Sequence, residues 1–359
     1  MPDPAVDLAE SLLDWFDRHG RHDLPWQKNV TPYRVWVSEI MLQQTQVSTV
    51  IPYFNKFVGR FPDVETLASA TLDEVLHLWT GLGYYARARN MHRTAQLIKG
   101  QYGGKFPNDI ETLMELPGIG RSTAGAILSL AFGQRQPILD GNVKRVLTRF
   151  HAIAGWPDSP IVARRLWQLA EEHTPHNDVA CYTQAIMDLG ATVCIRRNPL
   201  CGQCPVNTGC QAMQQSKQHS FPQSKPAKKL PVRKTVFAIL ENDQGNILLE
   251  HRQPAGIWGG LWAFPECTPE DDVASWIETE LGYAVNSLEY QKLIRHTFSH
   301  FHLDIVPVHA KIDVMNNRIN DSDKYCWYTP SSRQPLGMAT PVKKLLNKLT
   351  FKSTGLIND

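Results

Sequence analysis

Four cysteines lie in one short run, and this run constrains the fold more than any other feature of the chain. They are Cys194, Cys201, Cys204 and Cys210, separated by six, two and five residues. Four thiolates this close together favour a compact iron–sulfur cluster, because soft iron centres prefer thiolate ligands. A structural zinc site usually shows two CxxC units, and this run has one. Two disulfides are the other alternative, but the amino terminus shows no secretory signal that would indicate an oxidising compartment.

The remaining cysteines and the bulk composition set wider bounds. Cys181, Cys267 and Cys326 stand apart, and we expect them to be buried as small apolar side chains. A chain of 359 residues is too long for one ordinary core, so two or three domains are expected. The net charge of +2 says little about nucleic acid. Because no apolar run approaches the ~20 residues that cross a bilayer, we expect a cytoplasmic protein without a membrane partner, nucleoid-associated if bacterial. No motif indicates the oligomeric state, so a monomer is the default expectation.

The pattern of apolar residues divides the chain into two domains. Residues 1–217 show helical spacing throughout, with helices predicted over 31–44, 72–79, 108–116, 121–132 and 142–153. Residues 218–234 are rich in proline and basic residues and are predicted to be a linker. Residues 235–359 begin with a hairpin pattern around Asp243–Asn246, followed by a helix at 270–281 and strands at 290–298 and 302–312. This order predicts an all-α domain followed by an α+β domain.

A tight turn between two predicted helices could hold a phosphate. The first helix should begin with Asn108 as its cap and Glu111 three residues later. Gly118 and Gly120 then allow a sharp backbone turn before a helix that begins at Arg121. Bare N–H groups at a helix amino terminus bind anions, so a DNA phosphate is a candidate ligand. A plain αα-hairpin has the same local pattern, and only the wider context separates the two readings.

That context resembles a known family. The LPGIG hairpin is followed by LDGNVKRV and then by the four-cysteine run, as in the helix-hairpin-helix DNA glycosylases. Within that superfamily the chain is similar to the MutY family of adenine DNA glycosylases, through SEIMLQQTQV at 38–47, GLGYYAR at 81–87 and Phe298-Ser299-His300. The resemblance implies a helix-hairpin-helix domain with a [4Fe-4S] loop at 194–210, and a Nudix-like lesion-recognition domain.

The resemblance also implies an activity and a set of site residues. The activity is monofunctional removal of adenine mispaired with 8-oxoguanine or guanine in double-stranded DNA. The implied catalytic residues are Glu39, Asp140 and Asn142. The implied cluster ligands are Cys194, Cys201, Cys204 and Cys210. The implied DNA contacts are Gln44, Thr45, Tyr84, Gly118, Gly120, Ser122, Lys144, Phe298, Ser299 and His300.

The local sequence gives Glu39 and Asp140 chemically suitable surroundings. Thr31 should cap the helix that carries Glu39, and Pro32 suits its first turn. The apolar neighbours of Glu39, such as Val35 and Trp36, should raise the carboxyl pKa, which suits a general acid. Asp140 precedes a helix, so it can also serve as an ordinary N-cap. A solvated surface glutamate is the alternative for Glu39 if the family pattern is set aside.

Two other enzyme classes remain as alternatives. An endonuclease III-like enzyme that excises pyrimidines and nicks the strand has a nucleophilic lysine after the hairpin arginine, where this chain has Ser122. A hydroxyl cannot form a Schiff base, so Ser122 favours a monofunctional enzyme. A Nudix hydrolase would need a metal-binding box. Gly260 and Glu266 fit its first part, but Ala274-Ser275 and Glu278-Thr279 leave too few carboxylates for magnesium.

Overall fold

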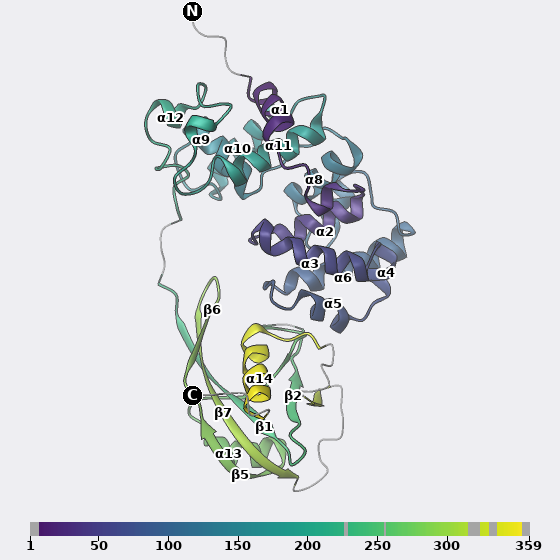
Figure 1. The fold of residues 1–359 in the computed structure, drawn as a ribbon, viewed down its shortest axis with the longest axis vertical. Helices are drawn as coiled ribbons and strands as arrows, with labels where there is room; N and C mark the ends of the chain where they lie inside the picture. The colour runs from purple at the N-terminus through teal and green to yellow at the C-terminus, as the bar shows by residue number, and fades with distance from the viewer. Residues whose placement is uncertain (1–6, 226–228, 255, 315–323, 330–335, 354–359) are drawn as a thin grey trace, which may run out of the picture. The chain divides into compact units, whose positions relative to one another are not determined.

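The computed structural model describes residues 7–225, 229–254, 256–314, 324–329 and 336–353 (Figure 1). The chain divides into two compact units. The first contains residues 1–69 and 90–226, and the second contains residues 70–89 and 227–359. Among the described residues, no helix has the length and apolar character that a membrane crossing requires.

The first unit is built from helices. Their bounds are α1 Leu8–His19, α2 Pro32–Leu42, α3 Val47–Arg60, α4 Val64–Ser69, α6 Ala86–Tyr102, α7 Ile110–Glu115, α8 Arg121–Phe132, α9 Gly141–Phe150, α10 Pro160–His173, α11 Val179–Thr192 and α12 Gln211–Gln214, with short 3₁₀ turns η1 Pro25–Gln27 and η2 Cys201–Gln203. One apolar core joins α1, α9, α10 and α11, and Cys194, Cys204 and Cys210 of the loop pack against it. The cluster loop is therefore attached to the same core that supports α9.

Side-chain caps explain where the helices α2 and α7 begin. The side chain of Thr31 accepts a hydrogen bond from Arg34 N, and Pro32 occupies the first turn of α2, as the sequence predicts. The cap of α7 differs from the prediction. Asp109, and not Asn108, accepts a hydrogen bond from Thr112 N, so the helix begins one residue later. A carboxylate that faces bare N–H groups is at least as good a cap as an amide.

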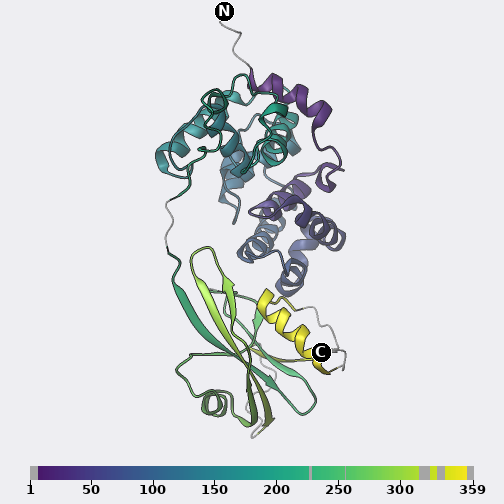
Figure 2. The same ribbon diagram turned by 60° about the vertical axis from the view of Figure 1, so that its left-hand side comes forward.

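The second unit contains a mixed sheet. Its bounds are β1 Val232–Glu241, β2 Ile247–His251, β3 Trp262–Ala263, β4 Glu266–Cys267, β5 Tyr283–Tyr290, β6 Ile294–Thr297, β7 His302–Val314 and β8 Tyr325–Tyr328, with α5 Leu72–Trp79, α13 Val273–Trp276, the π-helical turn η3 Ile277–Leu281 and α14 Thr340–Ser353. The central strands run in the order β3-β2-β1-β7-β5. Figure 2 shows α13 and α14 on opposite sides of this sheet. Alternating residues of β1 therefore face two apolar layers.

The predicted hairpin is present, and the later strands differ from the prediction. β1 and β2 pair antiparallel, with Glu241 opposite Ile247. The strand expected at 290–298 is wrong in its limits, because β5 ends at Tyr290 and a separate strand, β6, pairs with β7. β1 begins at Val232, inside the expected linker, because Val232 to Lys234 pair with His302 to Asp304 of β7. Residues 226–228 of that linker lie outside the described residues.

Residues 70–89 cluster with the carboxyl-terminal residues in the second unit. α5 begins with a capping box, in which Thr71 and Glu74 exchange hydrogen bonds. Within this unit, Tyr85 donates a hydrogen bond to Met338 O at 3.0 Å, and Arg89 donates one to Gly259 O at 2.7 Å. The helical spacing of residues 70–89 assigns them to the helical domain in the sequence. It does not indicate that they group with the carboxyl-terminal residues.

Candidate active site

Glu39 lies on α2, among apolar residues. The neighbouring side chains Val35 and Trp36 are buried, and the side chain of Glu39 is partly exposed. The surrounding protein raises the pKa of Glu39 to about 8, chiefly because burial disfavours the carboxylate, and the negative charge of Asp140 adds to the shift. The carboxyl group therefore carries its proton at neutral pH, as the sequence predicts for a general acid.

Asp140 is the N-cap of α9 and is bound by two donors. Its carboxylate accepts hydrogen bonds from Val143 N at 2.8 Å and from Asn142 Nδ2 at 3.2 Å. Burial raises the pKa of Asp140, while these hydrogen bonds and the charge of Arg145 act in the opposite direction. The two carboxyl groups influence each other, so they titrate as a pair. The hydrogen bonds to Asp140 and the charge of Arg145 favour its carboxylate form, whereas burial favours its neutral form.

Two glycines allow close packing around the segment that carries Asp140. A Cβ on Gly125 of α8 would lie 2.5 Å from Pro137 O, and a Cβ on Gly190 of α11 would lie 2.5 Å from Asn142 Cβ. Both distances are too short for any other residue. Ser122 adds a hydrogen bond, in which its hydroxyl accepts from Leu139 N at 3.0 Å. α8 and α11 thus fix the backbone on both sides of Asp140.

Arg145 connects this site to the cysteine loop. Its guanidinium donates to Asn142 Oδ1 at 2.8 Å, to Gly190 O at 2.6 Å and to Cys194 O at 2.7 Å. Asn142 in turn contacts Asp140, so a continuous set of hydrogen bonds joins the aspartate to the backbone of the first loop cysteine. The sequence reasoning missed this residue. Its position within LDGNVKRV, one turn after Asn142, was the signal available.

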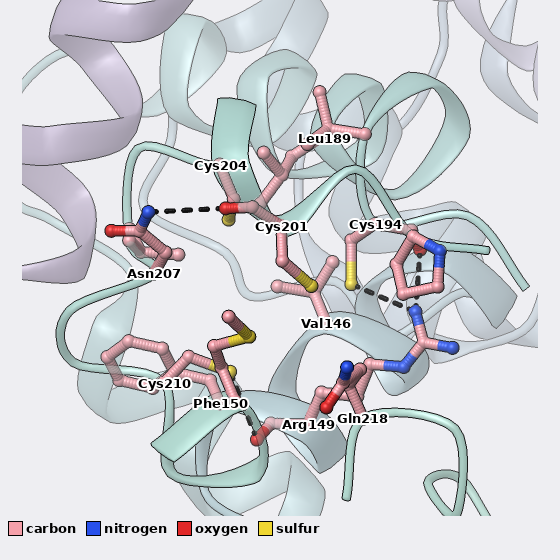
Figure 3. Close-up of a pocket in the computed structure, with 14 residues that line it drawn as sticks. Val146, Arg149, Phe150, Leu189, Cys194, Cys201, Cys204, Asn207, Cys210 and Gln218 are labelled. Atoms are coloured by element: carbon pink, nitrogen blue, oxygen red, sulfur yellow. Dashed lines mark hydrogen bonds between the residues drawn. The ribbon is translucent and has the colours of Figure 1, made fainter. Parts of the chain in front are cut away.

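The four loop cysteines line one pocket. Figure 3 shows Cys194, Cys201, Cys204 and Cys210 around a common space. Arg149 donates to Cys194 Sγ at 3.3 Å, which places a positive charge beside a sulfur ligand. Among the described residues, no three His, Cys, Asp or Glu side chains converge as they would around a single ion. The donors are instead spread around a cavity.

The chemistry of these thiols fits a cluster. Burial raises the pKa of Cys204 to about 12 and also raises the pKa values of Cys201 and Cys210, and the charges of neighbouring cysteines add to each shift. Four thiolates in such surroundings need a cationic centre to be stable. Iron ions supply that charge, so the donor set fits an iron–sulfur group.

The other cysteines only partly match the prediction. Cys267 is buried and Cys326 is half-buried. Cys181, expected to be buried, is exposed. It lies near the start of α11, on the helix side that faces away from the core. Residues three to four apart lie on the same face of a helix. A single cysteine therefore does not indicate by itself whether its side chain points to the core or to solvent.

The predicted DNA contacts are surface features in both units. Gly118, with φ +83°, and Gly120 form an exposed turn before α8. Gln44, with φ 57°, and Tyr84, with φ 50°, are exposed and adopt a left-handed backbone that is unfavourable for such residues. Thr45 is half-buried and donates to Gln43 O at 3.3 Å. Gln44 closely follows α2, which also carries Glu39.

Four further predicted DNA contacts lie on α9 and in the turn between β6 and β7. Lys144, on α9, forms an ion pair with Asp158 at 2.5 Å. A phosphate contact by Lys144 would therefore compete with an existing carboxylate. Phe298 is half-buried in the turn between β6 and β7, whereas Ser299 and His300 are exposed.

Comparisons with known proteins identify the relatives of each part. Residues 37–172 match the family model of the HhH-GPD superfamily of base excision DNA repair proteins, residues 194–210 match the iron–sulfur binding domain of endonuclease III, and residues 235–348 match the NUDIX domain. An adenine DNA glycosylase of Buchnera aphidicola subsp. Acyrthosiphon pisum (strain APS) is 40% identical over 339 residues, covering 94% of this chain and 96% of the relative. The chain belongs to the adenine DNA glycosylase family.

Other relatives agree with this family. The adenine DNA glycosylase of Homo sapiens is 39% identical, over 74% of this chain and 59% of the human protein. A thermostable thymine-DNA glycosylase has a similar structure, with a TM-score of 0.53 and 26% identity, over 58% of this chain and 95% of that chain. An endonuclease III in a DNA complex, at 22% identity and a TM-score of 0.50, shares the fold.

The family settles the class of enzyme and its cofactor. As an adenine DNA glycosylase, the chain is a DNA-binding N-glycosylase of base excision repair. Its cofactor is a [4Fe-4S] cluster. The predicted fold class, a helix-hairpin-helix domain with a cluster loop and a Nudix-like domain, is confirmed. The predicted enzyme class and cofactor are confirmed as well.

Proposed function

We propose that this glycosylase removes adenine mispaired with 8-oxoguanine or guanine, with Glu39 as the acid and Asp140 as the stabilising carboxylate. The observation that carries this assignment is the electrostatic contrast between the two groups. Glu39 has a pKa raised to about 8, and Asp140 accepts two hydrogen bonds that favour its ionised form. Glycoside cleavage commonly needs one protonated and one ionised carboxyl group, so the pair suits the reaction.

Glu39 acts on the leaving group. Adenine departs poorly as an anion, and protonation at N7 makes it a neutral leaving group. A carboxyl group that holds its proton at neutral pH can donate it in the transition state, which contributes about 10²- to 10⁴-fold in rate. The base must leave the helical stack before it can reach Glu39. Gln44 and Tyr84, which are exposed and held in a left-handed backbone, are the residues that fill or wedge the vacated stack.

Asp140 acts on the sugar. Cleavage leaves an oxocarbenium-like deoxyribose, which a nearby carboxylate stabilises, either electrostatically or through transient contact with C1′. Asn142 orients the carboxylate, and Arg145 holds Asn142. Water then completes hydrolysis and leaves an intact strand with an abasic site. Ser122 has no amine to form a Schiff base, so no strand nick follows.

The remaining residues bind DNA and the cofactor. Gly118, Gly120 and Ser122 at the start of α8 present N–H groups to a phosphate. Lys144 and Thr45 contact the backbone of the strand. Phe298, Ser299 and His300 contact the base opposite adenine. Cys194, Cys201, Cys204 and Cys210 hold the cluster, which maintains the shape of the loop. We further propose a cytoplasmic monomer in which the linker expected at 218–234 ends before Val232, where β1 of the carboxyl-terminal domain begins.

A base-release assay tests this function. The substrates are duplexes that contain adenine opposite 8-oxoguanine, opposite guanine and opposite thymine, under single-turnover conditions. The expected result is fast release opposite 8-oxoguanine, slower release opposite guanine, and intact strands until alkali is added. Strand nicking without alkali, trapped by borohydride, would favour an endonuclease III-like lyase. Hydrolysis of free nucleoside triphosphates with magnesium would favour a Nudix hydrolase, although Glu266 is already paired with Arg252.

A further inference from the structure

Phe298 lies in a short turn that is surrounded by aromatic rings. The turn connects β6 and β7, whose last pair is Thr297 with His302, and Phe298 N donates to Phe301 O at 2.9 Å. The ring of Phe298 stacks on Phe301 at 4.6 Å and meets the edge of His296 at 4.7 Å. Phe298 keeps part of its surface exposed. The ring of Phe298 therefore packs against other aromatic rings and keeps an exposed part that a ligand can contact.

One supporting ring comes from a distant part of the chain. Trp258, between β2 and β3, has its ring centroid 5.5 Å from Phe298 and 5.4 Å from His296. Trp258 also contacts Phe237 of β1, with the ring centroids 6.1 Å apart. His296 and Phe301 belong to the same hairpin as Phe298. Trp258 instead connects the turn to the core of the sheet.

The backbone of Trp258 is fixed without help from the turn. Trp258 is 7% exposed and has φ 54°, a left-handed conformation that a bulky residue adopts only when its surroundings impose it. Trp258 O accepts a hydrogen bond from Leu261 N at 3.0 Å, and Gly260 N donates to Arg252 O at 3.0 Å. The indole is therefore placed before any ligand arrives.

We propose that Trp258 is a positioning residue for lesion recognition, because it holds the Phe298 ring in the orientation that meets the base opposite adenine. This inference rests on the proposed function of the 298–300 turn. A preset aromatic ring stacks on a base at a lower entropic cost than a mobile ring. Removing Trp258 should free Phe298 and reduce the preference for 8-oxoguanine, although Trp258 itself contacts no DNA.

The test compares matched tryptophan variants. Trp258→Leu removes the ring, Trp258→Phe restores a ring, and Trp327→Leu removes a tryptophan that packs on Tyr283 elsewhere in the same sheet. The measured quantity is the ratio of single-turnover adenine release opposite 8-oxoguanine to that opposite guanine. We expect Trp258→Leu to lower this ratio about 3- to 10-fold, the scale of one lost aromatic pair. Trp258→Phe should keep most of the ratio, and Trp327→Leu should keep all of it.

Binding and a double variant separate positioning from folding. Binding is measured in a Glu39→Gln background, which prevents turnover. There, Trp258→Leu should lower the preference for duplexes with 8-oxoguanine opposite adenine over those with guanine, measured as the ratio of the two dissociation constants, by the same factor. Phe298→Ala should abolish most of the effect of Trp258→Leu, because coupled residues are not additive. If Trp258→Leu gives no cooperative melting transition, Trp258→Met replaces it with the same expectations.

Three results would overturn the inference. The first is an unchanged ratio in Trp258→Leu while Phe298→Ala lowers it, which leaves the proposed lesion reader intact. The second is an equal fall in Trp327→Leu, which would make domain stability the cause. The third is an unchanged ratio in Phe298→Ala, which removes the lesion-reading assignment itself.

Discussion

Glu39 and Asp140 are chemically similar side chains, and their different surroundings suit the two roles that we propose for them. Glu39 is in an apolar environment and faces a negative charge, so its acid form is favoured. Asp140 sits at a helix amino terminus and accepts hydrogen bonds from Val143 N and Asn142. The helix dipole adds to the preference for a carboxylate there. Burial raises the pKa of both carboxyl groups, and the hydrogen bonds at Asp140 oppose that shift.

Replacing the acid should nearly abolish catalysis. Glu39→Gln keeps the shape of the side chain and removes the transferable proton, so single-turnover adenine release should fall by about 10²- to 10⁴-fold. Duplex binding should change little, because the lost interaction belongs to the transition state. Glu10→Gln, at an exposed glutamate in the first turn of α1, is the control. Near wild-type release by Glu39→Gln would show that another group is the acid.

The pH dependence follows from the same group. Release requires protonated Glu39, so the rate constant should fall about tenfold per pH unit above about pH 8. It also requires ionised Asp140, so the rate constant should fall again in acid, where that carboxylate gains a proton. The free energy of unfolding should also decrease as pH rises. The folded state keeps a proton that the unfolded chain loses near its ordinary pKa, so stability decreases as pH rises from about 4.5 towards 8. Glu39→Gln should therefore raise the melting temperature at pH 8. A lower melting temperature would contradict this account.

At the scale of single elements, α9 is the part that joins the site to the cluster loop. Asn142, Arg145 and Arg149 follow one another at helical spacing, and contact Asp140, Cys194 O and Cys194 Sγ respectively. The position of α9 depends on its close contact with α11 at Gly190. A small displacement of α9 would move Asp140, the proposed catalytic aspartate, together with the cysteine loop.

Gly190→Ala tests this dependence. The new Cβ would lie 2.5 Å from Asn142 Cβ and 3.0 Å from Asn142 Cα, so the two helices must separate. Adenine release should fall by up to ~100-fold, the scale of a misplacement of about 1 Å. Gly59→Ala in α3 is the control, since nothing lies within 4 Å of its Cβ. Gly59→Ala should leave adenine release unchanged, and it should leave the melting temperature unchanged or raise it, because alanine favours helices. Equal activity of the two variants would rule out the close contact as a positioning device.

The sequence predicted local features well and distant contacts poorly. Residue types at short spacing were enough to predict three features. These are the cap of α2 at Thr31, the limits of α8 and the loop that carries the four cysteines. The cap at Asp109 differed because two adjacent residues can both cap a helix, and geometry selects one. Arg145 and Trp258 were missed because their partners, Cys194 and Phe298, lie far along the chain. No periodicity in a single sequence reports such pairs.

At the scale of the whole molecule, catalysis and lesion recognition should be separable. Removing residues 226–359 should lower the ratio of release opposite 8-oxoguanine to release opposite guanine, while some release opposite guanine remains. Because residues 70–89 cluster with the removed part, the melting of the truncated chain must be measured as well. Full-length Phe298→Ala is the matched control. A truncated chain that discriminates as well as the full chain would exclude the carboxyl-terminal domain as the reader.

The parallel pairing of β1 with β7 also determines when the second unit can form during synthesis. Val232 to Glu241 pair with His302 to Lys311, so β1 leaves the ribosome well before its main partner exists. The core that joins α1, α9, α10 and α11 uses residues no later than Cys210 and can assemble earlier. A nascent chain paused in between carries an apolar strand, including Phe237 and Ile239, with an unpaired edge. Slow translation across 242–301 should therefore favour aggregation, and fast translation should favour a soluble product.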